Sequence, residues 1–207
     1  MPITLKPSQR FGGNGGASHD DLGLIINDPS SSGIGIKKIL IIKIEAQCGN
    51  IVDSVQFTYR IETTDGFYEL LGNKYGGGGG ELSDKLIHTF TDDEQMTRIS
   101  GRTTPYIGTV ISNLEFYTSK NNIISCGNYT TNFDTSFTLP VGVFYGNGGD
   151  FVDNVGTYEI SDSQSTAIAL SCTTGIFGFC LLIIMGIFLW KKFRKQKAIP
   201  VPPLANN

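Results

Sequence analysis

Histidine, tryptophan and cysteine are scarce in this sequence, and charged residues of either sign are few. Of the 207 residues, two are His, one is Trp, four are Cys, and 17% carry a charge. Because His19 and His88 match no metal-ligand spacing, the sequence predicts neither a metal nor a cofactor. The sequence also contains no G-x-S-x-G, P-loop or H-E-x-x-H motif, so we expect no enzymatic activity.

The few charges are distributed unevenly. All 19 acidic residues precede residue 163, whereas five of the 16 basic residues lie in the last 17 residues. The larger part of the chain therefore has a net charge of −8, and the end of the chain has one of +5. Nucleic-acid binding needs clustered cations, so we expect no nucleic-acid partner for the acidic part.

One long apolar run lies near the C-terminus. Residues 167–190 contain no charged side chain and would form a helix about 36 Å long, against about 30 Å for the hydrocarbon core of a bilayer. Trp190 ends the run, and basic residues follow at once. This pattern predicts a polar linker over 161–166, a single transmembrane helix over 167–190 in the lipid bilayer, and a short basic cytoplasmic tail over 191–207.

A cytoplasmic tail predicts that the body of the protein, residues 1–160, is extracellular or lumenal. The sequon Asn128-Tyr129-Thr130 agrees with this and makes Asn128 a candidate glycosylation site. However, Met1–Gly13 has no apolar stretch typical of a signal peptide. An alternative therefore stays open, in which a tail-anchored module keeps its body in the cytosol and binds a protein or another non-carbohydrate partner.

The four cysteines do not decide between these compartments. Cys48 and Cys126 lie in the body, and the other two lie in the apolar run. A bridge between Cys48 and Cys126 is allowed, but sequence cannot fix the geometry that a disulfide needs. Two unpaired thiols are the simpler interpretation.

Residues 1–160 show no long amphipathic helical pattern and instead contain short apolar or alternating runs separated by Gly, Asn and Asp. Such runs predict an all-β sandwich, barrel or prism. The runs expected to be strands are Ile39–Ile44, Val52–Ile61, Lys85–Phe90, Val110–Tyr117, Ser136–Val143 and Val155–Ile160.

The body also contains an internal repeat. Gly49–Phe57 and Gly149–Thr157 share the pattern G-x-x-x-D followed by x-V, and Gly108–Phe116 keeps the glycine but has Ser112 in place of the aspartate. A glycine-rich loop also occurs twice, at Phe11–Gly16 and Tyr75–Gly80. The repeats indicate three related β units.

In their order along residues 3–160, these elements resemble the jacalin-related lectin family. The resemblance rests on the following segments: Gly12–Gly16, Ile36–Ile39, Ile51–Tyr59, Gly76–Gly80, Met96–Gly101, Leu114–Thr118, Ser136–Pro140 and Gly146–Gly156. It implies a β-prism of three Greek-key four-stranded sheets with pseudo-threefold symmetry. It also implies metal-independent binding of glycans, so we expect a membrane-anchored lectin.

By the same resemblance, the primary sugar site consists of Gly16 and of the turn formed by Gly149, Asp150, Phe151, Val152 and Asp153. Backbone N–H groups of this turn can donate to sugar hydroxyls, and the Asp153 carboxylate can accept two hydroxyl protons. The alternative is that Asp153 only caps its own turn. Shallow sugar sites bind weakly, so clustering of copies, as in a homo-oligomer, would strengthen binding.

A second, weaker site is expected at the equivalent turn, which comprises Gly49, Asn50, Ile51, Val52 and Asp53 and faces Gly80. The alternative is that this turn is only a structural relic of the repeat. No site is expected at Ser112, which lacks the carboxylate. Galactose-binding members of the family depend on a freed N-terminal glycine, and here Gly12 and Gly16 are internal. The resemblance therefore favours mannose- or glucose-type glycans.

Overall fold

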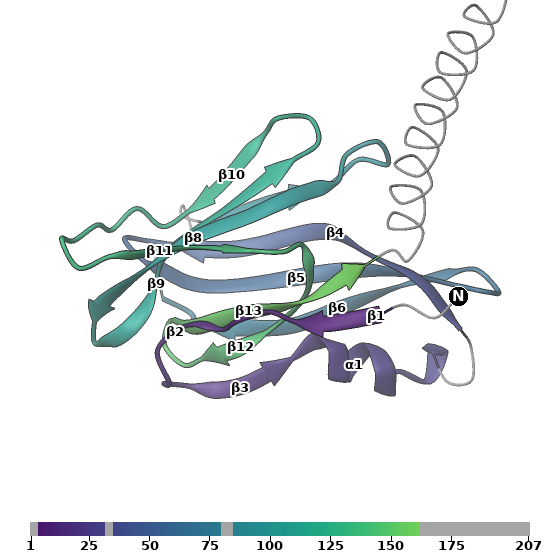
Figure 1. The fold of residues 1–207 in the computed structure, drawn as a ribbon, viewed down its shortest axis with the longest axis horizontal. Coiled ribbons are helices and arrows are strands. Elements are labelled where there is room, and N and C mark those ends of the chain that lie inside the picture. Colours follow the sequence, from purple (N-terminus) through teal and green to yellow (C-terminus); the bar gives the residue numbers. More distant parts are fainter. Residues whose placement is uncertain (1–3, 32–34, 80–84, 162–207) are drawn as a thin grey trace, which may run out of the picture. The chain divides into compact units, whose positions relative to one another are not determined.

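The computed structural model describes residues 4–31, 35–79 and 85–161, and these residues form three antiparallel β-sheets (Figure 1). The first, which we call the terminal sheet, contains strands from both ends of the described chain in the order β1-β13-β12-β3, and β2 also pairs with β13. Its strands are β1 (Thr4–Pro7), β2 (Phe11–Gly12), β3 (Ala17–Asp20), β12 (Gly142–Gly148) and β13 (Val152–Ser161).

The other two sheets are each built from four consecutive strands. One contains β4 (Ile36–Cys48), β5 (Val52–Thr63), β6 (Phe67–Gly76) and β7 (Lys85–Thr89) in the order β6-β5-β4-β7. The other contains β8 (Met96–Tyr106), β9 (Gly108–Thr118), β10 (Ile123–Cys126) and β11 (Thr135–Leu139) in the order β10-β9-β8-β11. In both, three strands connect as hairpins and the fourth returns beside the first, which is the Greek-key arrangement. The all-β prism of three sheets is confirmed, but the terminal sheet has five strands rather than the expected four, because both β1 and β2 pair with β13.

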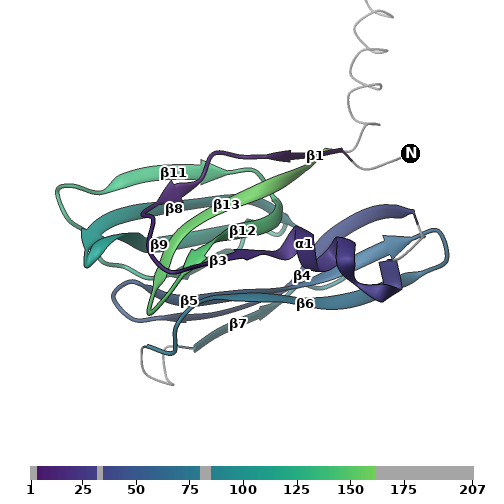
Figure 2. The ribbon, with the colours of Figure 1, turned by 90° about the horizontal axis from the view of Figure 1, so that it is seen from below.

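The terminal sheet brings distant parts of the sequence together. Its hairpin β12–β13 comes from the C-terminal part of the body, and β1 to β3 come from the N-terminus (Figure 2). Asn154 in β13 pairs with Gly12, and Gly148 in β12 pairs with Ala17. The loop between β2 and β3 therefore lies directly beside the turn between β12 and β13.

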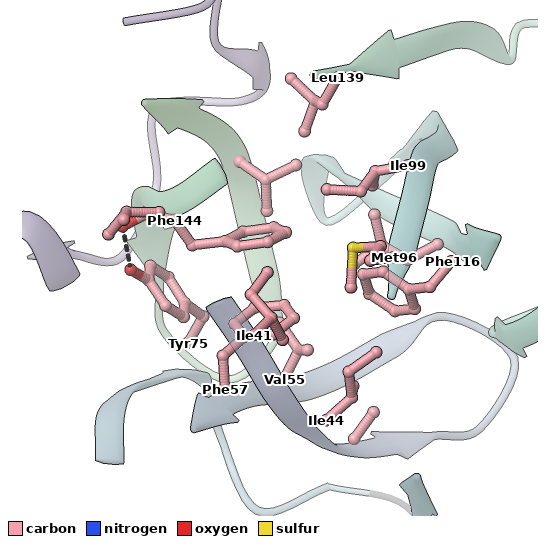
Figure 3. Packing of buried hydrophobic residues seen from close by; sticks show 14 of the residues in the cluster. Ile41, Ile44, Val55, Phe57, Tyr75, Met96, Ile99, Phe116, Leu139 and Phe144 are labelled. Atoms are coloured by element: carbon pink, nitrogen blue, oxygen red, sulfur yellow. Dashed lines mark hydrogen bonds between the residues drawn. The ribbon is translucent and has the colours of Figure 1, made fainter. Parts of the chain in front are cut away.

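The core lies where the three sheets meet. Phe57 from β5, Phe116 from β9 and Phe144 from β12 are each fully buried, so every sheet contributes one ring (Figure 3). The ring of Phe57 stacks on Phe144 with centroids 3.8 Å apart and meets Phe116 edge-on at 5.8 Å. Truncation of a ring in such a core typically costs about 3–5 kcal/mol, so these contacts hold the three sheets together.

Strand β5 shows how the alternation in the sequence produces this core. Val55, Phe57, Tyr59 and Ile61 are buried, and the residues between them are partly exposed. Successive side chains of a strand point to opposite faces, so the apolar set faces the other sheets. The expected strand Val52–Ile61 is confirmed.

One expected strand is two strands in the structure. The run Ser136–Val143 is divided into β11, which ends at Leu139, and β12, which begins at Gly142. Pro140 lies between them, and its missing N–H cannot continue a ladder of hydrogen bonds. The break moves the chain from the β8–β11 sheet to the terminal sheet.

Two short helices were not predicted from the sequence, α1 (Asp21–Asn27) and η1 (Pro29–Ser31). The Asp20 carboxylate caps α1 by accepting from the N–H groups of Leu22 and Gly23. Asp21 is fully buried, and its carboxylate accepts hydrogen bonds from the Asn73 backbone and side chain and from the Tyr59 hydroxyl. Burial raises the pKa of Asp21, and these donors oppose the rise.

Cys48 and Cys126 form a disulfide, with their Cα atoms 5.3 Å apart, so the simpler interpretation of two unpaired thiols is wrong. The two residues end β4 and β10, which are far apart in the sequence but adjacent in the prism. The bridge therefore links two of the three sheets.

The predicted anchor lies outside the described residues, as do the predicted tail and residues 162–166 of the linker. In the part of the chain that the structure describes, no helix is long and apolar enough to cross a bilayer. Strand β13 ends at Ser161, which the expected linker had included.

Candidate functional site

The turn between β12 and β13, Gly149–Asp153, is hereafter called the Asp153 turn. Gly149, Asp150 and Phe151 form the turn itself, and a register shift between Asn147 and Gly148 leaves Asp153 without a partner in the ladder. The Gly149 N–H donates to the Phe151 carbonyl at 3.0 Å. Among the described residues, the N–H groups of Asp150 and Phe151 have no acceptor. Both donors are therefore available to a ligand.

The loop Gly12–Gly16, hereafter the Gly12 loop, lies against the Asp153 turn. The Gly13 N–H donates to the Asp153 carbonyl at 2.9 Å. A Cβ atom at Gly15 or at Gly16 would overlap the carboxylate oxygens of Asp153, and Gly16 has a φ of +70°. The absence of side chains here lets main chain and carboxylate approach each other closely. The structure thus brings together all the residues expected at the primary site.

The Asp153 carboxylate of this turn is partly desolvated and lies near a second acidic group. Burial raises the pKa of Asp153, the Gly149 N–H acts in the opposite direction, and the nearby charge of Asp150 adds to the rise. A partly desolvated carboxylate gains more from a hydroxyl donor than one in water does. Its pairing with the N–H donors of Asp150 and Phe151 matches a ligand whose hydroxyls both donate and accept.

The tip of the hairpin β8–β9 also borders the site, which the sequence did not predict. The ring of Tyr106 meets the rings of Phe151 and Tyr129 edge-on, with centroids 5.7 and 6.0 Å apart. Tyr106 is half exposed, so this cluster offers an apolar surface beside the polar groups. Nothing in the spacing of Tyr106 relative to the turn indicated the contact, because it joins two different sheets.

The equivalent turn between β4 and β5, Gly49–Asp53, is called the Asp53 turn. Here the Gly49 N–H donates directly to the Asp53 carboxylate at 2.8 Å, and the Gly77 N–H donates to the Asp53 carbonyl at 3.0 Å. The Asp53 side chain is packed beneath Gly79 and only 5% of the residue is exposed. Gly80, also expected at this site, lies outside the described residues.

In the third unit, Ser112 replaces the carboxylate and its hydroxyl donates to the Arg102 carbonyl at 3.3 Å. A separate hollow of about 460 Å³ lies beside α1 and is bordered by His19, Asp20 and Leu71, among others. There the Asp20 carboxylate already accepts the hydrogen bonds that cap α1. The Asp153 turn therefore remains the better candidate for recognition of a polyhydroxylated ligand.

Comparison of this chain with known proteins identifies its family. The family model described as the jacalin-like lectin domain matches residues 8–158. The chain belongs to the jacalin-like lectin family. This is a family of carbohydrate-binding proteins, and its match covers every strand of the three sheets except β1 and the last three residues of β13.

The relatives of this jacalin-like chain include proteins described as lectins. Horcolin from barley, Hordeum vulgare subsp. vulgare, is 30% identical over 165 residues, which cover 76% of this chain and 96% of horcolin. Among solved structures, Malaysian banana lectin is 26% identical with a TM-score of 0.58, and the match covers 77% of this chain and all of the banana lectin chain. Artocarpin, described as a lectin with mannose specificity, has the same fold at 22% identity and a TM-score of 0.56, with 74% of this chain and 96% of artocarpin covered.

Proposed function

We propose that this chain is a membrane-anchored lectin that binds mannose- or glucose-type glycans through the Asp153 turn and the Gly12 loop. The observation that carries the proposal is the position of the Asp153 carboxylate. Gly15 and Gly16 lie against it, and two N–H donors without acceptors stand in the same turn. A pyranose ring presents adjacent hydroxyls that can bind both kinds of group at once. No metal ion is needed in this arrangement.

The preference for mannose or glucose has two supports. Artocarpin, whose fold is similar, is described as having mannose specificity. In addition, the glycines of the Gly12 loop lie within the chain, so the loop has no free amino terminus at the site. The rings of Tyr106 and Phe151 supply the apolar contact that the C–H face of a sugar prefers.

The membrane anchor and the outward-facing body also belong to this proposal. The uncharged run 167–190 with its basic flank supports the anchor. The Cys48–Cys126 disulfide supports an extracellular or lumenal body, because cytosolic thiols are kept reduced. This observation favours the lectin over the alternative of a cytosolic, tail-anchored module. Clustering of anchored copies would strengthen individually weak binding.

A glycan array tests the proposal directly. Residues 1–165 contain all three sheets and their core, and we expect them to bind mannose-rich glycans. Asp153→Ala should remove most of the signal. The matched control is Asp65→Ala, which removes the same charge from an exposed turn at the opposite end of β5 from the Asp53 turn. Unchanged array binding by Asp153→Ala would refute the site.

A further inference from the structure

The three hairpin turns and the loops beside them form a ring of equivalent contacts. Each loop has a glycine of positive φ at its start, and a Cβ atom there would overlap the carbonyl oxygen of the last turn residue in the same sheet. The glycines and the turn residues they contact are Gly12 with Asp153, Gly76 with Asp53, and Gly127 with Ser112. Gly127 is therefore the third unit's counterpart of the two loop glycines.

The residue after each of these glycines lies against the turn of the next sheet. Gly13 lies against the backbone of Thr109, and Gly77 lies against that of Asp150. At the third position stands Asn128, whose backbone N–H donates to the Asn50 carbonyl at 2.9 Å. Asn128 thus replaces a glycine at a place where any side chain borders the neighbouring turn. That turn is the Asp53 turn.

Further contacts fix Asn128 beside the Asp53 turn. The Tyr129 N–H donates to the same Asn50 carbonyl at 2.7 Å. The Cys48–Cys126 disulfide joins the residue before the turn to the residue before Gly127. A hollow of about 250 Å³ lies beside these contacts, and it is bordered by Cys48, Gly49, Leu86, Ser125, Gly127 and Asn128. A group attached to Asn128 would have this hollow directly before it.

Asn128 begins the sequon Asn128-Tyr129-Thr130, and both Asn128 and Thr130 are exposed in a segment without helix or strand. We propose that an N-linked glycan on Asn128 covers the Asp53 turn and closes it to other glycans, so that the Asp153 turn is the working site. The proposal rests on the proposed function, because it requires a lumenal body and a turn able to bind sugar.

Attachment of the glycan to Asn128 is a group transfer in which one bond forms and one bond breaks. Nδ2 of Asn128 forms a bond to the anomeric carbon of an oligosaccharide carried on a lipid diphosphate. The bond from that carbon to the diphosphate oxygen breaks, the lipid diphosphate leaves, and Nδ2 gives up one proton to a base of the transferase. Nothing is oxidised or reduced.

The Asp153 turn has no such neighbour. The position equivalent to Asn128 beside it is Gly77, which lies against Asp150 and carries no side chain that could be modified. A glycan on Asn128 would therefore cover the Asp53 turn and not the Asp153 turn, although the two turns have similar backbones.

The test uses the full chain produced in a eukaryotic secretory pathway and solubilised in detergent. Thr130→Ala removes the sequon but keeps Asn128 and its backbone bonds, and Thr130→Ser is the matched control that preserves the sequon. Asp153→Ala isolates binding at the Asp53 turn, and Asp53→Ala isolates binding at the Asp153 turn. The measurements are the mass change on enzymatic deglycosylation and the affinity for methyl α-mannoside.

We expect the original chain and Thr130→Ser to lose the mass of one glycan, and Thr130→Ala to lose none. In the Asp153→Ala background, Thr130→Ala should raise the affinity at least tenfold, whereas in the Asp53→Ala background it should change nothing. A chain without a glycan on Asn128, or no gain in the Asp153→Ala background, would overturn the inference alone. Failure of Asp53→Ala to bind, with or without Thr130→Ala, would overturn the proposed function itself.

Discussion

The Asp153 turn and the Asp53 turn share one backbone design but differ in what their carboxylates are free to do. In both, a glycine-rich loop lies over the turn and donates an N–H to the carbonyl of the aspartate. In the Asp53 turn the carboxylate also accepts from Gly49 and is almost wholly buried. In the Asp153 turn the Gly149 N–H donates to the Phe151 carbonyl at 3.0 Å and also lowers the pKa of the nearby Asp153 carboxylate, and Asp153 remains partly exposed.

The surroundings of the two turns differ as well. Tyr106 contributes an aromatic ring beside the Asp153 turn, whereas the loop containing Asn128 and the disulfide adjoin the Asp53 turn. Two copies of one motif can therefore differ in how accessible their carboxylates are to a ligand. The difference arises from the neighbouring sheet and not from the motif.

The largest expected effect concerns the Cys48–Cys126 disulfide, which adjoins the Asp53 turn. Replacing Cys48 and Cys126 together with Ser should lower the free energy of unfolding by about 4 kcal/mol, because the bridge closes a loop of 78 residues. Urea unfolding of residues 1–165 measures this change. Equal stability of the variant and the original chain would show that the bridge contributes nothing.

Next in size is the direct comparison of the two carboxylates. Asp153→Ala should weaken methyl α-mannoside binding at least about 100-fold, because two charge-assisted hydrogen bonds contribute roughly 3 kcal/mol together. Asp53→Ala should change the overall affinity less than about threefold, since that carboxylate is already bonded within its own turn. Calorimetric titration of both variants tests the comparison, and a larger loss in Asp53→Ala would reverse it.

The glycines over the carboxylates give a smaller effect. Gly15→Ala should displace the Asp153 carboxylate and weaken binding about tenfold, since its Cβ would overlap Oδ1. Gly78→Ala, in the loop over the Asp53 turn, is the control, because a Cβ there meets open space. If the two substitutions behaved alike, close approach to Asp153 would not matter for binding.

The smallest effect is the pH dependence. Because burial and Asp150 raise the pKa of Asp153, its ionised form, which accepts the sugar hydroxyls, is lost at a higher pH than for an ordinary aspartate of pKa about 3.9. Affinity should therefore be retained at neutral pH and fall as the pH drops through the raised pKa. Asp150→Asn should move this fall to lower pH, and titrations between pH 7 and pH 3.5 would detect it. A fall that did not move would exclude the influence of Asp150.

Much of the fold was predictable because its signals are local. The alternation in β5 and the repeated G-x-x-x-D pattern depend only on nearby residues, and both correspond to observed elements. Helix α1 was not predictable from periodicity, because it has seven residues and is held by the contacts of Asp21 with Tyr59 and Asn73.

The candidate site was predictable in its residues but not in its surroundings. The two repeated patterns and the family resemblance indicated the Asp153 turn and the loop Gly12–Gly16, which the fold brings together. The contact of Tyr106 with Phe151 and the pairing of Cys48 with Cys126 each join different sheets. Sequence spacing carries no information about such contacts. The sequence also did not show that Asp53 is almost wholly buried and accepts a hydrogen bond from Gly49.

The most direct test of the account locates the sugar on the protein. Amide signals of ¹⁵N-labelled residues 1–165 should be followed by NMR during titration with methyl α-mannoside. We predict that the largest shifts occur at Gly16 and at Asp150 to Asp153, with smaller ones at the tip of the β8–β9 hairpin. Shifts concentrated around the hollow beside α1, with none in the Asp153 turn, would contradict the central claim.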